Sequence, residues 1–101
     1  MPSREQLEEL LAAEPTDVFL LYAVAMACAS EGDTDQAVEK LAELVDEHPD
    51  YVPAWFQRGQ LLAGVNRNEE AREVLVEGIG VARRVGDRHA EGEMTEFLES
   101  L

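Results

Sequence analysis

The sequence predicts an all-α fold of about six helices, arranged as antiparallel helix–turn–helix repeats with no β-sheet. Ala, Leu, Val and Glu dominate the composition, whereas Thr and Ile are scarce, which favours helix over strand. Apolar residues recur at the three- and four-residue spacing of one helix face, and no segment alternates polar and apolar residues at a period of two. The pattern also recurs along the chain, which indicates a repeat architecture.

The first two helices are marked by their start and stop signals. Ser3 and Gln6 have the spacing of a capping box, and Pro15 follows the end of this helix. Asp17 can cap a second helix from residue 18 to about residue 30. Gly32 ends that helix, because glycine adopts the left-handed backbone of a tight turn without strain.

Caps and helix breakers also mark the boundaries of four further helices. Asp33 caps the third helix, which Pro49 follows, and the fourth begins near Pro53. The fifth runs from about residue 69 to residue 85, where Gly86 stops it. Asp87 caps the last helix, whose apolar residues are Met94, Phe97, Leu98 and Leu101 and whose polar outer residues are Glu91, Glu93, Glu96 and Glu99.

The helix pattern repeats after 34 residues, the distance from Pro15 to Pro49. Gly32 falls opposite Asn66, the other residue type that tolerates a left-handed turn. Further matches at this offset are Leu7, Leu41 and Leu75; Leu10 and Leu44; Ala37 and Ala71; Ala25 and Gly59; and Cys28 and Leu62. Each helix pair has an apolar face that only a stacked neighbour can cover, which is the physical reason for such a period.

A helix–turn–helix period of this length resembles the tetratricopeptide repeat family. The residues at the family's characteristic spacings are Leu21, Val24-Ala25, Cys28, Ala37, Leu41 and Pro49 in the first repeat, and Trp55, Arg58-Gly59, Leu62, Ala71 and Leu75 in the second. Arg58 replaces the usual Leu, and Arg83 replaces the closing Pro, so we expect the second helix of the second repeat to run longer. The resemblance covers about residues 3 to 85 and implies a superhelix of helix pairs.

We therefore expect residues 1–101 to form a single domain of this kind. Its predicted parts are a half-repeat helix at 3–14, a first repeat at 18–51, a second repeat at 52–85 and a capping helix at 87–101. The capping helix and the first helix would present polar residues outward, as the ends of a stacked array require.

The second helix is apolar on more than one face, which makes it the centre of the predicted binding site. A core face is formed by Leu21, Val24, Ala25 and Cys28, and a separate face by Phe19, Tyr22 and Met26. In the family, such positions line a concave groove that holds a peptide or helix of a partner. The predicted groove residues are Phe19, Tyr22, Met26, Phe56 and Gln60. The alternative is that the last helix or a second copy of the chain covers them.

The charge of the chain restricts its partners. The net charge is -14, from 22 acidic and eight basic residues, so nucleic acid and anionic membrane surfaces would be repelled. The acidity is explained equally by a basic partner or by adaptation to a high-salt cytoplasm. We expect a cytoplasmic protein, since the N-terminus is too charged for a signal peptide and the apolar run from Val18 to Ala29 is too short to span a membrane.

Catalytic and cofactor sites are not indicated. Cys28 lies in an apolar run and is expected to be a buried hydrophobic residue. His48 is expected to cap the last carbonyls of the third helix. His89 and Glu93 are one helical turn apart, but a metal site needs at least three convergent ligands. We expect no enzyme activity, cofactor or metal.

The predicted function is that of an adaptor or scaffold that binds a protein or peptide in an apolar groove with an acidic rim. Some members of the family clamp a C-terminal carboxylate with Lys, Asn and Arg, but the corresponding helices here offer only Arg58, so no such clamp is expected. The alternative function is a self-associating unit, a homodimer formed through the apolar face.

Overall fold

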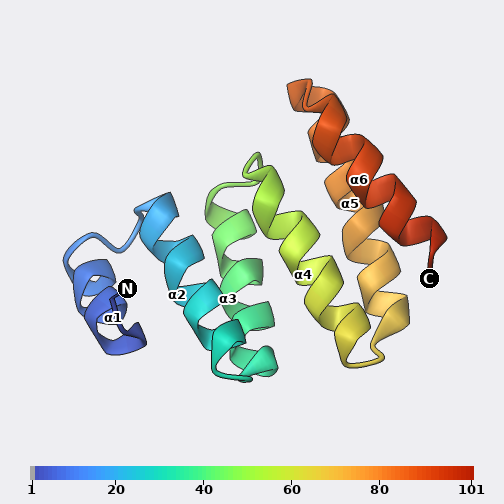
Figure 1. The fold of residues 1–101 in the computed structure, drawn as a ribbon. Helices are drawn as coiled ribbons and strands as arrows, with labels where there is room; N and C mark the ends of the chain where they lie inside the picture. Colours follow the sequence, from blue (N-terminus) through green and yellow to red (C-terminus); the bar gives the residue numbers. More distant parts are fainter. Residues whose placement is uncertain (1) are drawn as a thin grey trace. The chain divides into compact units, whose positions relative to one another are not determined.

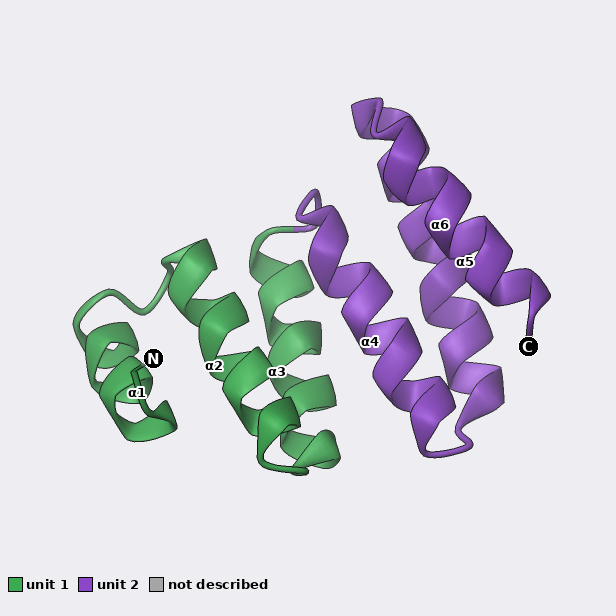
Figure 2. Ribbon diagram, in the orientation of Figure 1, with its two compact units in different colours: residues 1–48 green, residues 49–101 purple. Residues whose placement is uncertain are grey.

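The computed structural model describes residues 2–101, and these residues form six α-helices and no strand (Figure 1). The helices are α1 (Arg4–Ala13), α2 (Val18–Ser30), α3 (Thr34–Glu47), α4 (Val52–Gly64), α5 (Asn68–Val85) and α6 (Arg88–Glu99). The predicted all-α fold is confirmed. The chain divides into two compact units, residues 1–48 with α1 to α3 and residues 49–101 with α4 to α6 (Figure 2).

Side-chain caps start four of the six helices at the residues that the sequence indicated. Ser3 and Gln6 form the capping box of α1, with the Ser3 amide donating to Gln6 Oε1 over 2.8 Å. Asp17, Asp33 and Asp87 each accept a hydrogen bond from the backbone amide three residues later. Such a bond pairs an amide that the helix itself leaves unsatisfied.

Three tight turns end their helices in the same way. The residues with positive φ are Gly32 at 81°, Asn66 at 65° and Gly86 at 80°. In each turn the next amide donates to the carbonyl five residues before it, over 3.0 Å from Asp33 to Cys28 and 2.9 Å from Arg67 to Leu62. This is the bond of a Schellman motif, which needs a left-handed residue and so selects glycine or asparagine. The predicted equivalence of Gly32 and Asn66 is confirmed.

In the first unit, α2 and α3 pack against each other and α1 packs on α2. Ala25, Cys28, Leu41 and Leu44 are completely buried. No residue of α1 is buried, so α1 covers part of α2 but adds no core residue of its own. Arg4 helps to hold it, because its guanidinium donates to Glu8 over 2.7 Å and to Asp33 over 3.4 Å.

In the second unit, α5 packs between α4 and α6 through two glycines that allow close approach. A Cβ at Gly59 of α4 would lie 2.7 Å from Leu75 Cδ2, and a Cβ at Gly78 of α5 would lie 2.7 Å from Trp55 Cβ. The same Cβ at Gly78 would lie 2.9 Å from the sulfur of Met94, which is completely buried. Because glycine has no Cβ, the helices come closer at these two positions than they could with any other residue.

The length of α5 agrees with the missing proline. It has 18 residues, whereas α3, which Pro49 follows, has 14. The predicted extension past Arg83 is therefore confirmed. The division into 3–14, 18–51, 52–85 and 87–101 as parts of one domain stays a prediction.

Candidate functional site

The first three predicted groove residues lie on α2 in the first unit. Phe19 is 72% exposed, which is unusual for an aromatic side chain, while Tyr22 and Met26 are half-buried. They occupy a face distinct from that of the buried residues Leu21 and Val24. The apolar character of this face is therefore not explained by the core of α2 and α3.

The other two predicted groove residues, Phe56 and Gln60, lie one turn apart on α4 in the second unit and are half-buried. The ring of Phe56 meets the ring of Phe97 from α6 edge to face, with 6.0 Å between centroids and 67° between planes. The last helix thus covers part of Phe56, which is one of the alternatives considered above. That the α2 and α4 residues line one groove stays a prediction.

Two adjoining hollows lie between α4 and α6. The first, which we call the Phe97 hollow, has a volume of about 340 Å³ and is lined by Phe56, Glu93, Glu96, Phe97 and Ser100. The second, the His89 hollow, has a volume of about 230 Å³ and is lined by Val52, Pro53, Phe56, Gln57, Asp87, His89, Ala90 and Glu93. Phe56 and Glu93 line both, so the two form one continuous surface with an aromatic floor and carboxylates at its edge.

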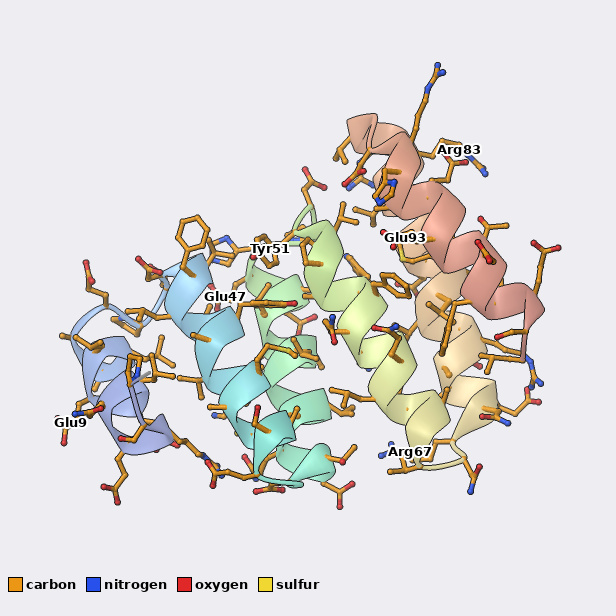
Figure 3. The ribbon with its side chains drawn as sticks, in the orientation of Figure 1. Glu9, Glu47, Tyr51, Arg67, Arg83 and Glu93 are labelled. Atoms are coloured by element: carbon orange, nitrogen blue, oxygen red, sulfur yellow. The ribbon has the colours of Figure 1, made fainter. Side chains whose placement is uncertain are left out.

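The contribution of α6 to these hollows follows from helical spacing. Glu93, Phe97 and Ser100 succeed one another at three- and four-residue intervals, which places them on one face of the helix. Glu93 lies on the side of α6 that faces α4 (Figure 3). Met94, the next residue, points into the core and packs beside Gly78. One helix therefore supplies both a buried anchor and the wall of an open hollow.

Polar contacts hold α6 on α5 at both ends. Near its start, Arg83 donates to Glu91 over 2.9 Å, and Figure 3 shows Arg83 beside the beginning of α6. At its end, Arg72 donates to the backbone carbonyl of Leu101 over 2.9 Å. Together with buried Met94, these contacts fix the position of Phe97 relative to Phe56.

The carboxylates of the hollows remain accessible to solvent. The Glu93 side chain is half exposed and its Oε1 lies 3.2 Å from His89 Nε2, a pair that is ionic only when the imidazole is protonated. Glu96 is exposed on the next turn. In the described chain, the five residues that line the Phe97 hollow include two carboxylates and neither lysine nor arginine.

Sequence reasoning did not single out Phe97, Glu93 and Glu96 as site residues, because it treated the last helix as a cap. Part of the signal was present in the spacing, since Glu93 and Phe97 are four residues apart and share a helix face. Which neighbour that face meets is decided by the packing of Met94 beside Gly78.

His48 makes one contact that the sequence did not indicate. Its Nε2 lies 2.9 Å from the carbonyl oxygen of Thr16, so the imidazole donates to the segment that joins α1 to α2. The expectation that His48 caps the end of α3 is confirmed for its backbone, because the His48 amide donates to the Leu44 carbonyl over 2.7 Å. The ring takes no part in this cap and contacts the α1–α2 segment instead. Residues 2–101 contain no group of three His, Cys, Asp or Glu side chains placed to hold a metal ion.

Cys28 is the small buried residue that the apolar run indicated. Burial raises the pKa of its thiol above the ordinary value, while the guanidinium of Arg4 opposes this effect. A buried thiol with a raised pKa carries little thiolate, which is the reactive form. No helix within residues 2–101 has the length and apolar character that crossing a bilayer demands.

Comparison with known families assigns the fold. Two models, each described as tetratricopeptide repeat, match residues 1–51 and residues 29–84. The chain therefore belongs to the tetratricopeptide repeat family, as its 34-residue period indicated. Repeats of this family generally mediate interactions between proteins and are generally non-enzymatic.

Individual relatives agree with this assignment. A TPR repeat-containing protein of Pseudomonas aeruginosa is 31% identical over 97 residues, which cover 96% of this chain and 92% of the relative. The solution structure of a tetratricopeptide repeat domain protein from Salinibacter ruber superposes with a TM-score of 0.80 at 29% identity, over 85% of this chain and 87% of the other. A solution structure of a Bordetella parapertussis protein gives a TM-score of 0.85 at 27% identity, over 99% and 87%.

Proposed function

We propose that this protein is a non-enzymatic adaptor that binds a segment of a partner protein in an apolar groove with an acidic rim. The observation that carries the proposal is the pair of aromatic-floored hollows between α4 and α6, bordered by Glu93 and Glu96. Apolar surface left open beside carboxylates suits a partner that brings both apolar and cationic groups. The predicted groove residues on α2, of which Phe19 is the most exposed, are part of the same proposal as apolar surface of the first unit.

The net charge of -14 supports a protein partner rather than nucleic acid, because phosphate backbones would be repelled. We place the protein in the cytoplasm on the basis of its sequence. A partner segment in these hollows would bury the rims of Phe56 and Phe97, and aromatic side chains of this kind are the usual energetic centres of protein interfaces.

The proposal is tested by replacing two aromatic groove residues together, Tyr22→Ala and Phe56→Ala, and measuring which proteins the tagged chain captures from lysate. We expect the specific capture to be lost while helical circular dichroism is retained. The matched control is Val76→Ala, which removes an apolar side chain of 59% exposure from the surface of α5. Capture that is unchanged in the double variant would contradict the proposed groove.

Self-association through the same face is the alternative, and the oligomeric state separates the two. A monomer in light scattering at micromolar concentration leaves the face available to a partner. A dimer that Phe56→Ala dissociates, and Val76→Ala does not, would show that a second copy occupies the site instead.

A further inference from the structure

We propose that the Phe97 hollow is a receptor for an arginine side chain of the partner protein. This inference rests on the proposed function and specifies the chemistry of its ligand. Of the two explanations of the acidity, it adopts the basic partner, and it names the acidic residues that would bind that partner.

The floor suits a planar cation. Phe56 and Phe97 meet edge to face, so part of a ring face remains available beside the contact, and both side chains are half-buried rather than enclosed. The face of an aromatic ring carries the negative end of its quadrupole and attracts a cation placed above it. A guanidinium stacks flat on such a face, whereas an ammonium is a compact and strongly hydrated charge.

The edge supplies the counter-charge in a suitable geometry. Glu93 and Glu96 stand one turn apart on α6, and both line the hollow together with the two rings. A guanidinium has five N–H donors and can bind two carboxylates at once, or one of them through two parallel bonds. Ser100 adds a hydroxyl oxygen at the same hollow, although it already donates to the carbonyl of Phe97 over 2.6 Å.

No cation of the described chain occupies this position. The basic side chains of α5 near α6 are engaged elsewhere, Arg83 with Glu91 and Arg72 with Glu69 and Leu101. His89 lines the neighbouring hollow and lies 3.2 Å from Glu93. Glu96 has no ion pair among those found in residues 2–101, while the net charge of -14 attracts cationic partners from a distance.

The hollow is large enough to admit one side chain. Its volume of about 340 Å³ lies at the lower end of the range for small-molecule pockets, which is about 300–1,000 Å³. The adjoining His89 hollow, with Val52, Pro53 and Ala90 in its wall, offers apolar surface to the residue that flanks the arginine.

The test uses the full chain, isotopically labelled, and the probe N-acetylarginine amide at constant ionic strength. N-acetyllysine amide and N-acetylnorleucine amide are the comparison probes, because they vary the charge and its shape on a similar stem. We expect the arginine probe to shift the NMR signals of Phe56, Glu93, Glu96 and Phe97 most, the lysine probe less and the norleucine probe least. Added salt should weaken the arginine response, since the contact is exposed to solvent.

Two single variants and one control locate the effect. Glu93→Gln and Glu96→Gln should each weaken binding of the arginine probe by about two- to fivefold, as expected for an exposed ion pair with a cation–π contribution. Glu99→Gln makes the same charge change on the same helix at a residue that does not line the hollow, and it should have little effect.

The proposal is overturned if the norleucine or lysine probe binds as well as the arginine probe, or if Glu99→Gln weakens binding as much as Glu93→Gln. It is also overturned if the shifts fall outside the hollow. These failures are distinct from failure of the proposed function. If the double variant Tyr22→Ala, Phe56→Ala loses protein capture but one of these arginine experiments fails, the proposed function stands. The hollow would then recognise a side chain other than arginine.

Discussion

The close approach of α4, α5 and α6 at Gly78 makes a sharp prediction about one methyl group. In the variant Gly78→Ala, the new Cβ would lie 2.7 Å from Trp55 Cβ and 2.9 Å from the sulfur of Met94. Optimal contacts between carbon atoms are about 3.5–4.0 Å, so both neighbours must move outward by roughly 1 Å. Trp55 Cβ is attached directly to the backbone of α4, so a rotamer change cannot relieve the contact.

The magnitude follows from two opposing effects. Replacing glycine by alanine inside a helix stabilises it by about 1 kcal/mol, while overpacking a closed core costs about 1–3 kcal/mol. Gly80 provides the matched control, because it lies two residues further along α5 and a Cβ there would meet nothing within 4 Å. Gly80→Ala should therefore stabilise by about 1 kcal/mol, and Gly78→Ala should be less stable than Gly80→Ala by about 1–3 kcal/mol.

Thermal unfolding followed by helical circular dichroism measures this difference directly. For a domain of this size, 1 kcal/mol corresponds to roughly 4–8 °C in Tm, so the two variants should differ by roughly 4–24 °C. The tightness at Gly78 would be refuted if Gly78→Ala were stabilised as much as Gly80→Ala. Because Met94 anchors α6, we also expect Gly78→Ala to alter the Phe97 NMR signals, which Gly80→Ala should leave in place.

Three further variants test the contacts described above. Trp55→Phe should lower the free energy of unfolding by about 1–2 kcal/mol in urea, because it removes the 2.9 Å bond from the indole N–H to the Pro49 carbonyl; an unchanged midpoint would contradict this. Asp17→Ala should cost about 1 kcal/mol through loss of the α2 cap, whereas Glu39→Ala on the exposed side of α3 should change little. Cys28, whose pKa is raised by burial, contributes stability that is fully present below its unfolded pKa of about 8.5 and is lost as pH rises through the folded value. Tm should thus fall more steeply above that pH in the parent than in Cys28→Ala, and equal slopes would count against a buried thiol.

The helices and their boundaries were predictable because their signals are local. A capping side chain at Ser3 or Asp17 acts within three residues, and Gly32, Asn66 and Gly86 end helices through a backbone conformation that depends on residue type. The 34-residue period then identified the family, since it reflects the burial that each helix pair requires of its neighbour.

The candidate site was predictable only in part. The apolar face of α2 and the position of Phe56 could be found from spacing, and the structure leaves Phe19 exposed and Phe56 half-buried. The ring contact of His48 could not be found from the sequence, because its partner Thr16 lies 32 residues away in the chain. A side chain at a helix end can turn to its own carbonyls or to another segment, and spacing does not distinguish these choices.

Sequence alone determined the fold class, the repeat, the ends of the helices and the acidity of this protein, because each depends on residue type and short-range order. Tertiary structure decided what the last helix does. Met94 beside Gly78 sets the rotation of α6, and that rotation brings Phe97 against Phe56 with Glu93 and Glu96 around them. The physical reason is that the same mixed helix face can meet solvent or a neighbour, and only the packing of the opposite face selects between them.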